Sequence, residues 1–355
     1  MITIHKKNNP LLVNIIILRV IAIILVVLGH SLRNMEAPNL HLFFPYYTSE
    51  IEVFIKNYIY SFHMPLFFFI SGYVFYFINT KKEKNYSISI ELKKKFKRLI
   101  IPLYATSFLI LLPTMFIFGN LNISILKQSI FMLQMVSNDH LWFLEALFLI
   151  FILIIPISSY VKKQKIFTLI VIVGLTILLY INIPLHVSFL SILFKYLPYF
   201  VLGIITQKLN FTSTKKTYLF IGLFLLIIHF IGFLILNNFY YMDINNKYVV
   251  YVLAMLGIYA YYSLATYISH LEIPSSIWEK ILILDNNSFS IYLFHVVVLY
   301  IILYFNRYFT IENNWFRIIS VLIFGILLPI YIQKILSKNK FTSFLFSIKH
   351  KTINE

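Results

Sequence analysis

The chain has 355 residues, of which 60% are hydrophobic and only 12% are charged. Soluble globular proteins carry about 25% charged residues, so this composition excludes a soluble enzyme. The formal net charge of +17 would suggest nucleic acid in a soluble protein, but here Lys and Arg are interpreted as markers of cytoplasmic loops. We therefore expect the lipid bilayer as a partner and no nucleic acid. The absence of Cys excludes disulfides and thiolate metal sites.

Apolar stretches recur along the whole chain, and most of them approach the ~20 residues that cross a bilayer as a helix. Ten such stretches lie at 11–31, 57–79, 99–118, 140–158, 166–183, 190–206, 217–236, 248–268, 287–306 and 316–336. Segment 121–137 is a candidate for an additional surface helix. The stretches do not alternate with period two, so we predict an all-α, polytopic membrane bundle of about ten transmembrane helices rather than a β-barrel.

The distribution of Lys and Arg predicts the orientation of this bundle. If the N-terminus is cytoplasmic, the outer loops hold only Arg33, Lys56, Lys127, Lys247 and Arg307, and the inner segments hold most of the 30 cations. This asymmetry follows the positive-inside rule and predicts cytoplasmic N- and C-termini. No repeat or linker divides the chain, so we predict one membrane domain over 1–338 and a basic cytoplasmic tail over 339–355.

The first span carries two polar side chains that are costly in hydrocarbon unless they are paired or functional. Arg19 and His30 are eleven positions apart, which at about 100° per residue is within ~20° of three whole turns, with a rise of ~16 Å. They are therefore predicted to share one helix face. Two structural alternatives stay open: Arg19 forms an ion pair with a neighbouring helix, and His30 is a polar tip at the membrane surface.

Three further spans carry ionisable residues. His63 is near the start of the second span, where Pro65 suits the first turn of a helix. Glu145 lies in the fourth span, and Trp142 stands on the same face three residues earlier. His295 lies nearer the middle of the ninth span, where the alternative is a histidine that packs helices together. Together with Arg19 and His30, these residues predict acid–base chemistry or proton conduction.

A basic segment with five cations in six residues, 93–98, precedes the third span and is interpreted as an inner loop. Lys95, Lys97 and Arg98 are candidate ligands for the phosphates of a nucleotide-like molecule or of anionic lipid. The alternative is a topology signal alone. The sequence has no glycine-rich phosphate loop and no HExxH motif, and Asp is rare, so we expect no metal cofactor.

These residues lie in motifs that resemble a known family. The motifs are Arg19 and His30 separated by ten residues, Phe-His63-Met-Pro-Leu-Phe-Phe-Phe-Ile-Ser-Gly-Tyr, Lys-Phe-Lys-Arg98-Leu-Ile-Ile-Pro, Leu-Trp142-Phe-Leu-Glu145 and Ser-Ile-Tyr-Leu-Phe-His295. In this order the chain is similar to membrane-bound acyltransferase family 3, the integral-membrane O-acyltransferases of bacterial surface glycans. His63 makes it most similar to the fucose 4-O-acetylase-like branch. The carboxylate segment lacks the fuller Trp-Ser-Leu-x-x-Glu pattern of larger relatives.

The resemblance implies transfer of an acetyl group from cytoplasmic acetyl-CoA to a sugar hydroxyl of a surface polysaccharide or its lipid-linked precursor. It implies a multi-pass protein of the bacterial cytoplasmic membrane, and leaves homo-oligomerisation open. The implied roles are catalysis for His30, Arg19, His63 and Glu145, donor binding for Lys95, Lys97, Arg98 and Arg19, and acceptor binding for Trp142 and His295. A competing class is a sugar exporter or a proton-coupled transporter, although no inverted repeat is evident.

Overall fold

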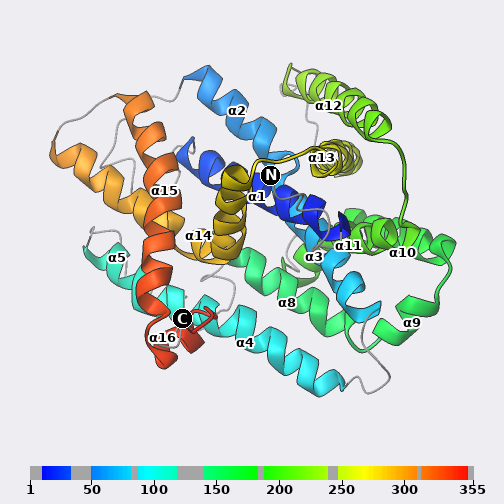
Figure 1. Ribbon diagram of the computed structural model, residues 1–355, viewed down its shortest axis with the longest axis horizontal. Coiled ribbons are helices and arrows are strands. Elements are labelled where there is room, and N and C mark those ends of the chain that lie inside the picture. The colour runs from blue at the N-terminus through cyan, green and yellow to red at the C-terminus, as the bar shows by residue number, and fades with distance from the viewer. Residues whose placement is uncertain are drawn as a thin grey trace. The chain divides into compact units, whose positions relative to one another are not determined.

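A computed structural model shows helices in every part of the chain that it describes (Figure 1). The structure describes residues 10–32, 49–80, 87–117, 140–182, 188–238, 247–309 and 313–350, and no β-strand occurs within these ranges. The surface helix predicted at 121–137 lies outside the described residues. So do several of the loops whose charges predict the orientation, and the chain ends 1–9 and 351–355.

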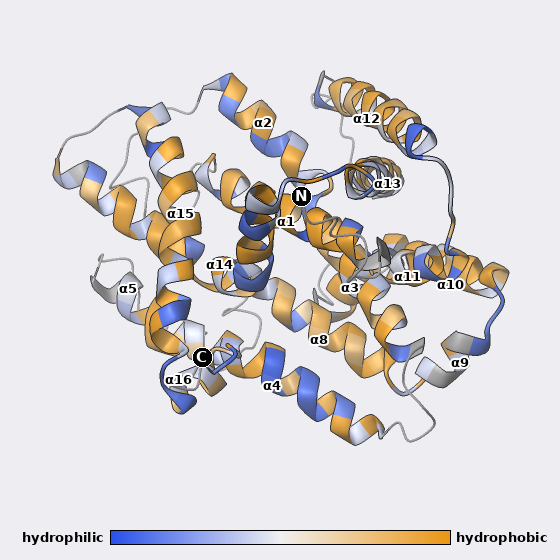
Figure 2. Ribbon diagram, viewed as in Figure 1, coloured by the Kyte–Doolittle hydropathy of each residue, from blue (hydrophilic) through white to orange (hydrophobic). Residues whose placement is uncertain are grey.

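Helices and short turns make up nearly all of the described chain. In chain order they are α1 (Pro10–Ser31), α2 (Glu50–Tyr60), α3 (His63–Thr80), α4 (Ile88–Thr106), the π-helical segment η2 (Ser107–Leu111), α5 (Leu112–Ile117), α8 (Trp142–Ile154), α9 (Ser158–Lys163), α10 (Ile166–Asn182), α11 (Ser188–Leu209), α12 (Lys215–Asn238), α13 (Lys247–Ser269), α14 (Ser275–Tyr308), α15 (Asn314–Leu336) and α16 (Lys340–Leu345). Figure 2 shows that hydrophobic residues cover most of them, while α4 contains a hydrophilic stretch.

The predicted polytopic helical bundle is confirmed, but the spans differ in length from the prediction. Within the described ranges, eight helical segments are long and apolar enough to cross a membrane: Val13–Ser31, Glu50–Asn79, Ile88–Thr114, Leu190–Leu209, Lys215–Asn237, Tyr248–Ser269, Ser275–Asn306 and Asn314–Leu336. The spans predicted at 140–158 and 166–183 correspond to shorter apolar helices, Trp142–Ile154 and Ile166–Ile181.

Two segments predicted as loops are helical. The cations of 93–98 lie inside α4, because Lys, Leu, Arg and Glu are strong helix formers and no Gly or Pro interrupts α4 before Pro102. Pro102 removes one backbone N–H from the helix ladder, and η2 follows within five residues. Similarly, α14 begins at Ser275 and includes much of the loop predicted at 269–287.

The chain divides into two compact units, each built from segments far apart in the sequence. Unit 1 contains Met1–Ala22, Asn57–Tyr86 and Leu153–Asn286. Unit 2 contains Ile23–Lys56, Ser87–Ile152 and Asn287–Glu355. The segment predicted as a basic tail, 339–355, includes α16, which packs against α4 in unit 2.

In unit 1, α3 and α11 cross at two glycines. A Cβ atom at Gly72 would overlap the backbone carbonyl of Phe200, and one at Gly203 would overlap the backbone carbonyl of Phe69. Small residues let two membrane helices approach to backbone contact, which replaces the hydrophobic driving force that lipid cannot supply. The crossing therefore depends on the absence of side chains at both positions.

This crossing predicts a position-specific cost of one methyl group. Gly72→Ala should lower the stability of the purified protein, because forced overpacking costs about 1–3 kcal/mol or more when backbone must move. Gly174→Ala is the matched control, since nothing lies within 4 Å of a Cβ at that position. Thermal unfolding in detergent, followed by tryptophan fluorescence, measures both. Equal midpoints for the two variants would contradict the close crossing.

In unit 2, α15 packs closely on α1 and α14. Leu299 and Leu303 of α14 form a buried cluster with Val321 of α15. One turn further along α15, a Cβ at Gly325 would lie 3.0 Å from Val27 Cγ1 and 3.9 Å from His295 Cβ. The absence of a side chain at Gly325 therefore brings α15 against the segment of unit 2 that carries His295.

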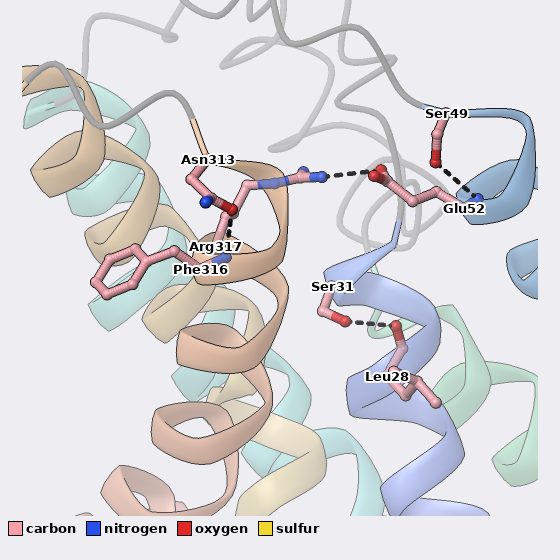
Figure 3. Close-up of polar contacts among 7 residues, drawn as sticks. All are labelled: Leu28, Ser31, Ser49, Glu52, Asn313, Phe316 and Arg317. Carbon is pink, nitrogen blue, oxygen red and sulfur yellow. Dashed lines mark hydrogen bonds and ion pairs between the residues drawn. The ribbon is translucent and has the colours of Figure 1, made fainter.

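Unit 2 also contains a buried ion pair between α2 and α15 (Figure 3). The Arg317 side chain extends toward Glu52, with Nη2 3.3 Å from Oε2, and the two side chains are 3% and 2% exposed. Ser49 caps α2 by accepting a hydrogen bond from the Glu52 N–H, and the Asn313 side chain caps α15 by accepting one from the Phe316 N–H. The view also includes the last turn of α1, where the Ser31 hydroxyl donates to the Leu28 carbonyl.

Candidate active site

Three imidazole rings from separate parts of the chain meet in unit 2. The ring of His30, on α1, lies 4.9 Å from that of His295, on α14, measured between centroids. The ring of His140, in the turn before α8, lies 5.0 Å from His295 and 6.3 Å from His30. His295 and His140 are 1% and 4% exposed, whereas His30 is only half-buried. The sequence predicted His30 and His295 as site residues but not His140.

Backbone carbonyls determine which nitrogen of two of these rings carries the proton. His295 Nδ1 lies 2.9 Å from the carbonyl oxygens of both Ile291 and Tyr292. A carbonyl only accepts hydrogen bonds, so Nδ1 is the protonated nitrogen and Nε2 holds the lone pair of the neutral ring. By the same argument, His140 Nε2 donates to the Leu293 carbonyl at 3.2 Å, which leaves Nδ1 as its basic nitrogen.

Helix α8 is anchored beside this histidine cluster, defined as His30, His140 and His295. The Tyr292 hydroxyl donates to the backbone carbonyl of His140. The Phe143 ring packs edge to face on Tyr292, with 5.7 Å between centroids. Glu145 and Trp142 are both partly exposed on α8, and Glu145 lies within electrostatic range of Tyr104 on α4. Their roles as catalytic carboxylate and acceptor ligand stay predictions.

The cations of α4 fall on two sides of the helix rather than in one patch. Lys95 Nζ lies 4.1 Å from the centroid of the Phe151 ring on α8, a cation–π contact. Lys97 Nζ lies on the other side, 5.9 Å from the Phe344 ring of α16. Arg98 follows Lys95 by three residues and Lys97 by one, so it lies between the two sides and nearer to Lys95. Lys93, four residues before Lys97, is on the side of Lys97.

A family model described as an acyltransferase domain matches residues 12–334, nearly the whole chain. The chain belongs to acyltransferase family 3. Together with the eight helices of spanning length, the match identifies a multi-pass membrane acyltransferase and favours that class over an exporter. Comparison with curated proteins and with solved structures finds no match. Membership of the fucose 4-O-acetylase-like branch stays a prediction.

In unit 1 of the acyltransferase, Arg19 forms an ion pair with a neighbouring helix, which is one of its two predicted alternatives, but the sequence does not predict the partner. Its Nε lies 2.9 Å from Asp285 Oδ1, with the side chains 31% and 12% exposed. Asp285 was overlooked because residue 285 was predicted to lie in a loop, whereas it lies within α14. Because Asp285 contacts Nε, the two terminal nitrogens of the Arg19 guanidinium can donate hydrogen bonds to another group.

His63 is the first residue of α3, in unit 1, and is 2% exposed. Its Nδ1 lies 2.9 Å from the Ile59 carbonyl, so Nε2 is the basic nitrogen of the neutral ring. The Tyr60 ring packs against it at 4.7 Å between centroids. The sequence correctly placed Pro65 in the first helical turn. A catalytic role for His63 stays a prediction.

A second buried histidine of unit 1 was missed. His229, on α12, is 0% exposed, with Nε2 3.1 Å from Ser61 Oγ and Nδ1 3.2 Å from the Tyr58 hydroxyl. A histidine in the apolar run Leu-Leu-Ile-Ile-His-Phe-Ile was a visible signal for a buried polar contact. Among the described residues, no group of three or more His, Asp or Glu side chains is arranged to hold a metal ion.

Proposed function

We propose that this acyltransferase moves an acetyl group from cytoplasmic acetyl-CoA to a sugar hydroxyl of a surface polysaccharide or its lipid-linked precursor. The observation that carries the proposal is the histidine cluster, in which three imidazoles from distant segments lie within 6.3 Å of one another. Imidazoles titrate near neutral pH, and a family of acyltransferases needs a group that accepts the proton of the attacking hydroxyl.

The proposed step is general-base catalysis. A basic ring nitrogen of the cluster takes the proton of the sugar hydroxyl, and the hydroxyl oxygen forms a bond to the thioester carbonyl carbon. The carbon–sulfur bond then breaks, and the proton passes from the imidazolium to the leaving thiolate of CoA. His30 is our choice for the base, because it is the most exposed ring of the cluster. A transient acyl-histidine is the alternative form of the same chemistry.

For the donor we propose the cations on the α8-facing side of α4. Lys95 lies on this side and Arg98 near its edge, whereas Lys97 lies beside α16. CoA carries phosphates and is available on the cytoplasmic side, where the positive-inside rule is expected to place these cations. For the acceptor we propose Trp142, whose ring suits stacking on a sugar, and His295. The bacterial cytoplasmic membrane is the proposed location.

Transfer of radiolabelled acetyl from acetyl-CoA to glycan tests this function directly. Purified protein in lipid vesicles is supplied with labelled acetyl-CoA and with lipid-linked or polysaccharide acceptors. We expect a base-labile acetyl ester on the glycan that requires both protein and acceptor. Movement of glycan across the vesicle membrane without ester formation would instead support the exporter.

The donor site predicts a kinetic effect of charge removal. Lys95→Gln with Arg98→Gln should raise KM for acetyl-CoA by about tenfold or more, because charge-assisted contacts to phosphate are lost. The kcat at saturating donor should be retained, since such contacts bind substrate and transition state alike. Lys93→Gln with Lys97→Gln is the matched control, with the same charge change on the other side of α4. An unchanged KM in the first variant would show that these cations do not bind the donor and serve only as a positive-inside signal.

A further inference from the structure

An apolar groove of about 330 Å³ runs along α4 and η2 in unit 2. Its lining includes Ile101, Tyr104, Ala105, Phe108, Leu109 and Leu345. Phe108 and Leu109 are 41% and 58% exposed, so the groove is open along its side. Tyr104 and Phe108 stack with 11° between their ring planes, which makes a flat apolar wall. Since α4 and η2 belong to a segment of spanning length and composition, an open apolar groove along them is suited to contact with lipid.

Two lysines continue the line of the groove toward the start of α4. The groove residues Ile100, Ile101 and Tyr104 follow Lys97 at three, four and seven positions, which is the spacing of one helix face. Lys93 precedes Lys97 by four positions and lies on the same face. This face of α4 is therefore cationic in its first turns and apolar in the turns that follow.

Helix α16 lies beside both Lys97 and the groove. Lys97 Nζ lies 5.9 Å from the Phe344 ring, and the next residue, Leu345, lines the groove. Phe341 and Phe344 are 67% and 48% exposed, and the neighbouring Lys340 is also exposed. Exposed aromatic rings beside lysines are typical of a segment at the boundary between headgroups and acyl chains.

We propose that this groove binds one acyl chain of an anionic phospholipid, with the headgroup phosphate against Lys93 and Lys97. The rise from Lys97 to Phe108 is about 16 Å, and one leaflet of the ~30 Å hydrocarbon core is about 15 Å deep. The groove thus matches the depth of one acyl chain, and the cations lie where that chain's headgroup would be.

Other ligands match only part of this surface. Free phosphate has no chain, and the pantetheine arm of acetyl-CoA carries polar amide groups that an apolar groove cannot satisfy. A neutral lipid fills the groove but gains little from the lysines, which each contribute to attraction by anionic headgroups. The lipid site centres on Lys97, which faces α16, whereas the proposed donor site centres on Lys95, which faces α8.

Native mass spectrometry of the purified full-length protein tests the proposal. Phosphatidylglycerol and phosphatidylcholine with identical chains are titrated into protein in neutral detergent, and bound lipid is counted. We expect the wild type to retain phosphatidylglycerol preferentially. Lys93→Gln with Lys97→Gln should weaken phosphatidylglycerol retention by about tenfold or more, because two headgroup contacts are lost. Lys95→Gln with Lys215→Gln, which removes equal charge from the opposite side of α4 and from the start of α12, should retain it.

A second variant tests the groove itself. Ala105→Trp fills the apolar face and should reduce retention of both lipids without changing any charge. A monodisperse elution profile confirms that each variant is folded. The proposal is overturned if Lys93→Gln with Lys97→Gln binds phosphatidylglycerol like the wild type. It is also overturned if the two charge variants lose lipid equally, or if Ala105→Trp has no effect. An acetyl-transfer failure with intact lipid binding would count against the proposed function alone.

Discussion

Replacing His30 by Ala is expected to lower acetyl transfer by about 10²–10⁴-fold, the usual contribution of a positioned general base. His30 is the half-buried member of the histidine cluster, with its ring 4.9 Å from that of His295. The turnover number at saturating acetyl-CoA and acceptor is the quantity to measure. The fold should survive, because His30 is near the end of α1 and Ala is a strong helix former.

His350→Ala provides the matched control for this variant. His350 is also in unit 2, but its Nδ1 donates to the Ser337 carbonyl at 2.8 Å, outside the histidine cluster. It should transfer acetyl groups at nearly the wild-type rate. Near-normal turnover of His30→Ala would remove His30 from catalysis and direct attention to His63. Labelled acetyl that stays on denatured wild-type protein, but not on His30→Ala, would establish an acyl-histidine in place of the general base.

The Arg19–Asp285 ion pair predicts the second large effect. Arg19→Lys keeps the charge but loses the planar fork that can hold Asp285 and a second anionic group together. We expect it to lower kcat/KM for acetyl-CoA by about tenfold or more. If Arg19 were only a structural cation, Lys would largely restore activity. Asp285→Asn should also be impaired, because Nε would lose its carboxylate partner at 2.9 Å.

The double variant, Arg19→Lys with Asp285→Asn, shows whether the two residues act together. If they do, its loss of kcat/KM should be smaller than the product of the two single losses. Thermal unfolding of all three variants provides a separate readout. Equal losses of stability and activity would indicate a structural ion pair, whereas a loss of donor affinity at wild-type stability would support a role in binding.

Apolar periodicity and length were sufficient to predict the class of fold, because a bilayer requires long apolar helices whatever the contacts between them. Helix ends were less predictable. The cations of 93–98 and the polar residues before 287 suggested loops, yet polar side chains alone do not end a helix where no Gly or Pro interrupts the sequence. The two glycines of the α3–α11 crossing were visible in the sequence, but not their partners Phe200 and Phe69.

The candidate site was predicted in part. His30 and His295 were found because burying a histidine in an apolar span costs free energy unless it is paired or functional. His140 was missed as a site residue because it precedes α8, and a polar side chain at the end of a span carries no evident desolvation cost. Its significance arises only from tertiary structure, which brings the Leu293 carbonyl to its Nε2. Likewise, Asp285 becomes a candidate residue only through its ion pair with Arg19, which no rule of sequence spacing predicts.

Gly325 takes no part in the chemistry, yet the packing of α15 beside the histidine cluster depends on it. A Cβ there would lie 3.0 Å from Val27 Cγ1, which is tighter than ordinary van der Waals contact, so the Val27 side chain or the α1 backbone would have to give way by a few tenths of an ångström. Val27 lies three residues before His30, on the same side of the helix, and the shift would be passed along that turn. A single methyl group on α15 would therefore press on the helix that carries His30 without touching either imidazole ring.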